Sequence, residues 1–164
     1  EAYAGSARRA RRVRGGPPRR AVTAAFRALP AYRALVEECR RRPECPKDAT
    51  TGQPEPWRLE LRAFRFPGER RIHVTVSLPE AGCAEWGPGM GALFVLDGIR
   101  DRTPQLRSWT ETELGVPRLM VDVERDGTLE LLTSRWTAGA DLELLDERGR
   151  LRRSWTTVFV GCGC

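Results

Sequence analysis

The sequence predicts an α+β fold, in which an N-terminal helical segment packs on an antiparallel β-sheet of about six or seven strands stapled by disulfides. Three observations support it: an apolar stripe of helical period near the N-terminus, two-residue periods after residue 57, and five cysteines. At 164 residues, the chain has the length of one domain with a tail. We expect residues 1–20 to be a disordered or extended arginine-rich arm and residues 21–164 a single domain, with helices in 21–42 and β-structure in 57–164.

The helical prediction rests on Val22, Phe26 and Leu29, whose spacing puts them on one face of a helix. The stripe continues to Cys39, and Pro30 interrupts it. Proline fits the first turn of a helix and breaks an interior. We therefore expect two short helices that meet at Leu29–Pro30, or one kinked helix.

The strand prediction begins with a hairpin across residues 57–78. Apolar and polar residues alternate from Trp57 to Ala63 and again from Ile72 to Leu78. Phe64 then falls out of phase with Ala63, which predicts a bulge there. The segment 92–96 is apolar at every position and predicts a central strand covered on both faces. Further short strands are expected near residues 118–124, 128–134, 141–146 and 151–160.

The arm carries the excess charge of the chain. Residues 1–20 hold seven arginines against one glutamate, which accounts for the whole formal net charge of +6. We interpret the arm as a segment that docks on an acidic partner, with a solvated tail as the alternative. The predicted partner-binding residues are Arg8, Arg9, Arg11, Arg12, Arg14, Arg19 and Arg20. The same residues suit nucleic acid or an anionic surface, where phosphate contacts would dominate the affinity.

The cysteines indicate the compartment. Their spacing fits no zinc ribbon or finger, so disulfides in an exported protein (periplasmic, cell-surface or secreted) are the better interpretation. Cys39 and Cys45 could close a tight loop, or each could pair with Cys83 or with the C-terminal Cys162 and Cys164. For the last two cysteines we favour staples to separate parts of the fold. The odd count leaves one thiol free or bonded to another chain.

Residues 119–132 combine a β-hairpin pattern with an acidic loop. Apolar residues alternate on both sides of Asp126–Gly127, a favoured hairpin turn. Calcium takes six or more oxygen ligands from carboxylates at alternate loop positions, a backbone carbonyl and a distal acid. The candidate calcium ligands are Asp122, Glu124, Asp126, Thr128 and Glu130.

Residues 118–146, with this loop followed by Leu129-Glu-Leu-Leu132, resemble the FG-GAP/VCBS-type repeats of integrin-alpha-like proteins. Those repeats carry the pattern D-x-D-x-D-G-x-x-[DE]. The resemblance implies a calcium-stabilised hairpin in an exported, often adhesive or partner-binding protein.

Signals for catalysis are weak in this sequence. His73, the single histidine, is predicted on a strand surface without an activated nucleophile beside it. No glycine-rich phosphate loop follows a strand, and no apolar run reaches the ~20 residues of a membrane span. The sequence therefore predicts a non-enzymatic, exported binding or accessory subunit whose basic arm docks a partner, with the nucleic-acid or anionic-surface binder as the alternative.

Overall fold

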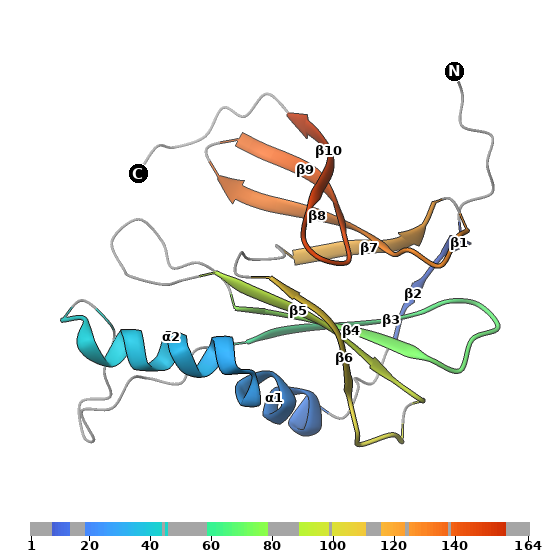
Figure 1. Ribbon diagram of the computed structural model, residues 1–164. Helices are drawn as coiled ribbons and strands as arrows, with labels where there is room; N and C mark the ends of the chain where they lie inside the picture. The colour runs from blue at the N-terminus through green and yellow to red at the C-terminus, as the bar shows by residue number, and fades with distance from the viewer. Residues whose placement is uncertain are drawn as a thin grey trace.

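The computed structural model describes residues 8–13, 19–43, 45, 59–78, 89–98, 100–110, 116–123, 125–137 and 139–156. These residues form three layers: a pair of helices, a central sheet and an outer sheet (Figure 1). The helices are α1 (Arg19–Ala28) and α2 (Pro30–Arg41).

The central sheet has the order β2-β3-β4-β5-β6 and the outer sheet the order β1-β7-β8-β9-β10, with antiparallel pairing throughout. The central strands are β2 (Arg11–Arg12), β3 (Glu60–Arg65), β4 (Ile72–Leu78), β5 (Met90–Leu96) and β6 (Gln105–Thr110). The outer strands are β1 (Arg8–Arg9), β7 (Val116–Asp122), β8 (Glu130–Thr137), β9 (Gly139–Asp146) and β10 (Leu151–Thr156).

Helices packed on an antiparallel sheet agree with the predicted class, but one sheet of six or seven strands is wrong. The structure has two sheets of five strands each. The larger number of strands has two sources in the sequence. The strand β6 has no clear alternation, and the arginine-rich residues of β1 and β2 do not look like strands at all.

The two helices meet at Leu29–Pro30, as one of the two predicted alternatives requires. Leu29 leaves the helical region with φ −59° and ψ 134°, and Pro30 opens α2 in its first turn. Proline is tolerated there because the first amides of a helix have no intrahelical partner.

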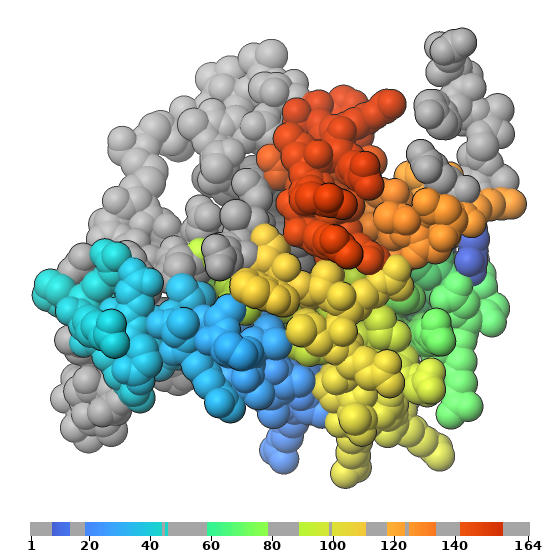
Figure 2. Space-filling model, in the orientation of Figure 1, coloured from blue at the N-terminus to red at the C-terminus, as the bar shows by residue number. Residues whose placement is uncertain are grey.

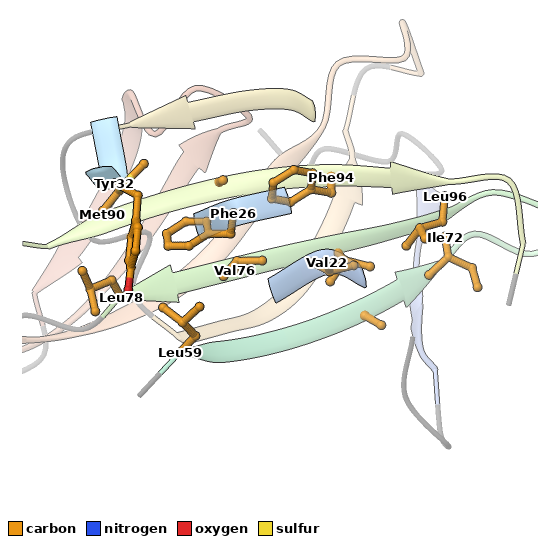
Figure 3. Close-up of a cluster of buried hydrophobic side chains, with 13 residues drawn as sticks. Val22, Phe26, Tyr32, Leu59, Ile72, Val76, Leu78, Met90, Phe94 and Leu96 are labelled. Carbon is orange, nitrogen blue, oxygen red and sulfur yellow. The ribbon is translucent and has the colours of Figure 1, made fainter. Parts of the chain in front are cut away.

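A first core lies between the helices and the central sheet (Figure 3). Val22 and Phe26 of α1 are fully buried, and the Phe26 ring packs edge-on against Tyr32 of α2 at 5.4 Å between centroids. The sheet supplies alternate residues of its middle strands to this face: Ile72, Val74, Val76, Leu78, Met90, Ala92, Phe94 and Leu96. Burial of each large side chain contributes about 1.5–3 kcal/mol.

A second core lies between the two sheets. Phe64 and Leu93 of the central sheet pack there with Met120, Leu131 and Leu145 of the outer sheet. Leu93 and Phe94 are neighbours on β5 yet enter different cores, so β5 is covered on both faces as predicted.

The bulge predicted near Ala63 is wrong. The register of β3 with β4 runs without a shift from Glu60↔Ser77 to Phe64↔His73. Ala63 and Phe64 are both buried because they face the first and the second core respectively. Consecutive apolar residues in β3 therefore reflect two covered faces, with no change of register.

Residues 8–13 of the arm are a strand shared by both sheets. Arg8 and Arg9 pair with β7, and Arg11 and Arg12 pair with β3. Between them the Ala10 amide donates a hydrogen bond to the Met120 carbonyl at 3.0 Å, and Ala10 is 4% exposed in the second core. We call this segment, residues 8–13, the bridging strand.

The sheets are also joined along β6, the other edge of the central sheet, which contacts the β7–β8 and β9–β10 connections. In Figure 2 the red atoms of the C-terminal strands rest on the yellow atoms of the β6 region. The Arg107 guanidinium donates to the Glu147 carboxylate at 2.6 Å and to the Gly127 carbonyl at 2.9 Å. The Ser108 hydroxyl donates to the Glu147 carbonyl. Polar contacts thus join one edge of the central sheet to the outer sheet, and the bridging strand joins the other edge.

An Ala10→Asp substitution tests the bridging strand. We expect it to lower the free energy of unfolding by at least about 3 kcal/mol, because it buries an unpaired carboxylate between the sheets. Urea denaturation followed by circular dichroism measures this. The neighbouring Arg11→Asp, at an exposed position, should cost less than about 1 kcal/mol. Equal costs would show that the arm does not bury Ala10.

Candidate docking surface where the two sheets meet

A basic hollow of about 500 Å³ lies where the bridging strand passes from the outer sheet to the central sheet. Four arginines line it, Arg9, Arg11, Arg12 and Arg118, and the rest of its lining is apolar: Ala10, Phe64, Pro67 and Leu119. Of the described residues that line it, none is acidic. We call this feature the arginine hollow.

The backbone explains why these side chains converge. Arg9, Arg11 and Arg12 are exposed on a short strand whose main chain is hydrogen-bonded to β7 and β3. Arg118 is added by β7, at a register shift between Pro117 and Leu119 that leaves it outside the regular pairing. The hollow therefore combines a hydrogen-bonded backbone with four arginine side chains in its lining.

The seven arginines predicted to bind a partner do not stay together. Arg9, Arg11 and Arg12 line the hollow, whereas Arg8 turns to the other side of the strand. Arg19 and Arg20 are exposed in the first turn of α1, where Arg19 reaches the Leu59 carbonyl at 3.5 Å. Arg14 lies outside the described residues. Sequence reasoning missed Arg118, because nothing local marks an arginine on a distant strand as a neighbour of the arm.

Arg8 anchors the bridging strand to the turn after β3. Its guanidinium donates to the Glu69 carboxylate at 2.6 Å and lies 5.2 Å from the centre of the Phe66 ring. The other Glu69 oxygen is 3.8 Å from Nε2 of His73, and the His73 ring packs edge-on against Phe66 at 5.7 Å. An ion pair, a cation–π contact and an aromatic pair thus connect the arm to β4.

The prediction of His73 on a strand surface is wrong. His73 is 4% exposed because its face of β4 is covered by the outer sheet, and neither ring nitrogen has a hydrogen-bond partner among the described residues. Burial lowers the pKa of His73, the positive charge of Arg107 lowers it further, and Glu69 opposes both. His73 is therefore a buried, mainly neutral imidazole at neutral pH.

The hairpin predicted around Asp126–Gly127 is confirmed. The strands β7 and β8 pair through Val121↔Glu130, and Gly127 takes a positive φ of 83° in the connection between them. This connection is longer than a two-residue turn. The Asp126 carboxylate accepts the Thr128 amide at 2.7 Å, a bond that lowers the pKa of Asp126.

The candidate calcium ligands are spread over this hairpin. Asp122 is 3% exposed with one carboxylate oxygen that lacks a hydrogen bond, whereas Glu130 shares its face with Val121 and accepts the Val123 amide at 3.1 Å. Glu124 lies outside the described residues. Among the described residues, including those of this hairpin, no three histidine, cysteine or acidic side chains form a group that could hold a metal. Calcium binding at Asp122, Asp126, Thr128 and Glu130 stays a prediction.

Cys39 and Cys45 form a disulfide at the end of α2, with 5.4 Å between their Cα atoms. Of the two predicted alternatives, the structure therefore has the tight loop. It leaves neither cysteine for a bond to the C-terminal pair. Cys83, Cys162 and Cys164 lie outside the described residues, so their pairing stays open.

Comparison with known proteins gives no match: no family model fits the chain, and neither a curated protein nor a solved structure is similar to it. The resemblance of residues 118–146 to FG-GAP/VCBS-type repeats therefore stays a prediction.

The buried imidazole predicts a loss of stability in acid. Because the pKa of His73 is lower in the folded than in the unfolded state, the unfolded chain takes up the proton first as pH falls below about 6.5. The free energy of unfolding should then fall by up to about 1.4 kcal/mol per pH unit, the slope for one proton.

Urea titrations from pH 7.5 to about pH 5 in the wild type and in His73→Gln measure this contribution. The histidine-free variant should show a shallower dependence on pH in this window. Identical slopes in the two proteins would contradict the assignment to His73.

Proposed function

We propose that this protein is a non-enzymatic, exported binding subunit that docks an acidic partner at the arginine hollow. The carrying observation is the convergence of Arg9, Arg11, Arg12 and Arg118 at a site with no acidic residue among its described lining. Guanidinium groups bind carboxylates and phosphates through paired, charge-assisted hydrogen bonds. Four of them around one hollow attract an anionic group that carries several charges.

Several arginines outside the hollow form ion pairs with acidic side chains. Arg42 is bound to Glu38, Arg107 to Glu147 and Arg150 to Asp146. These pairs neutralise charge on α2 and on the turns of the outer sheet. The described lining of the hollow, in contrast, contains no carboxylate.

A binding role without catalysis is supported by the position of His73. It is enclosed between the sheets beside Glu69 and Phe66, where a substrate has no access.

No described helix is long and apolar enough to cross a membrane.

Nucleic acid is the second candidate partner, because the same guanidinium groups pair with phosphate. An acidic polypeptide is our first choice, since the hollow is compact and part of its lining is apolar.

Exchange of the hollow arginines tests the proposal. The triple variant Arg9→Gln, Arg11→Gln, Arg12→Gln should bind a fluorescent poly-glutamate peptide at least about tenfold more weakly than the wild type in anisotropy titrations. A matched control, Arg33→Gln, Arg41→Gln, Arg102→Gln, removes the same charge from exposed positions on α2 and the β5–β6 connection. The control should bind within about twofold of wild type. Equal losses of affinity in both variants would show that binding depends on net charge alone and would contradict docking at the arginine hollow.

The Cys39–Cys45 disulfide allows the proposal of export to be tested separately. Protein purified under non-reducing conditions and digested should yield a cross-linked peptide pair containing both cysteines, because bonds of this kind persist in oxidising compartments. Rapid alkylation of both thiols in freshly extracted protein would contradict export.

A further inference from the structure

The face of the outer sheet that points away from the central sheet carries an apolar row. Leu119, Leu132 and Leu144 occupy directly paired positions on β7, β8 and β9. Their chain neighbours Met120, Leu131 and Leu145 fill the second core. Because successive side chains of a strand point to opposite faces, the leucine row must face outward.

The row is larger than three leucines. Leu142 lies two positions before Leu144 on β9, and its partner on β10 is Trp155, which is 46% exposed. Leu119, Leu132, Leu142 and Leu144 are half-buried. In Figure 1 the helices lie on the far side of the central sheet, so they do not cover this face.

Cationic groups stand at both ends of the row. Leu119 is itself part of the arginine hollow and follows Arg118 in the chain. Arg9 joins it because Arg9 pairs with Val121, which shares the face of Leu119. At the far end, the exposed Arg153 pairs with Leu144 on β10.

Two carboxylates on the same face are already engaged. The Glu130 carboxylate accepts the Val123 amide, and the buried Asp146 carboxylate accepts the Arg148 and Arg150 amides and the Arg150 side chain. Among the described side chains of this face, the leucine row thus lies between two cationic ends, and both carboxylates are held by hydrogen bonds.

We infer that the arginine hollow and the leucine row form one continuous docking surface for an acidic polypeptide segment that also carries apolar side chains. This inference rests on the proposed function and names its partner more closely. Acidic side chains of the segment lie against Arg9, Arg118 and Arg153, and its apolar side chains cover Leu132, Leu144 and Trp155. A phosphate backbone satisfies the arginines but leaves the row exposed to water, so a polypeptide fits the whole surface better.

Two short peptides of equal length and charge test the inference with the full chain: one alternates glutamate and leucine, and the other alternates glutamate and glutamine. The wild type should bind the glutamate–leucine peptide about tenfold more tightly in anisotropy titrations, because that peptide buries apolar surface on the row. The double variant Leu132→Thr, Trp155→Ser should lose this preference and keep its affinity for the glutamate–glutamine peptide.

The matched control is Leu106→Thr, Trp109→Ser. These β6 residues are 44% and 43% exposed and pair with Phe94 and Ala92, which places them on the helix-facing side of the central sheet. This control should keep the full preference. Trp155→Ser by itself carries the test if circular dichroism shows that the Leu132 variant is unfolded, because Trp155 is an exposed side chain.

The possible results distinguish a failure of the inference from a failure of the proposed function. Equal affinity of the wild type for both peptides would overturn the inference and leave the proposed function standing. No binding of either peptide would overturn both. Tighter binding of random duplex DNA than of both peptides, unaffected by Trp155→Ser, would assign the surface to nucleic acid and overturn the inference.

Discussion

Burial of the central sheet on both faces is the constraint on which the rest of the structure depends. The strands β4 and β5 are almost wholly buried, and their alternate residues point to the helices and to the outer sheet. A sheet of this kind needs a cover on each side. The helices supply one cover, and the C-terminal half of the chain supplies the other. The bridging strand then completes an edge of both sheets, which is why an arginine-rich segment became ordered structure.

The same constraint explains which features the sequence could predict. The helix pair, the break at Pro30, the hairpin of β3 with β4 and the central position of β5 follow from local period and from proline chemistry. The second sheet did not follow, because alternation shows that one face of a strand is buried and does not show what buries it. His73 illustrates the point: in the pattern of β4 it is an outward residue, and the outer sheet encloses it.

The candidate site was also predictable from the sequence only in part. The charge of the arm was visible in the sequence, and three of its arginines line the hollow. The pairing of Arg8 with Glu69 and the approach of Arg118 from β7 are consequences of tertiary pairing. The leucine row is likewise invisible without the second sheet, because Leu119, Leu132 and Leu144 gain their common face from register. Local patterns thus identified the charged component of the surface but not the apolar one.

The bridging strand also affects the order in which the chain can fold. Its partner residue for Arg8 is Asp122, and its partner for Arg12 is Phe64. Contacts between residues so distant in sequence require closure of long loops, which slows folding. During synthesis Arg8 and Arg9 cannot pair until β7 has emerged, although α1, α2 and the β3–β4 hairpin can form earlier from local contacts. In that interval the β3 edge of the central sheet lacks the completed bridging strand, so the nascent chain passes through a state that is open to strand addition from other chains.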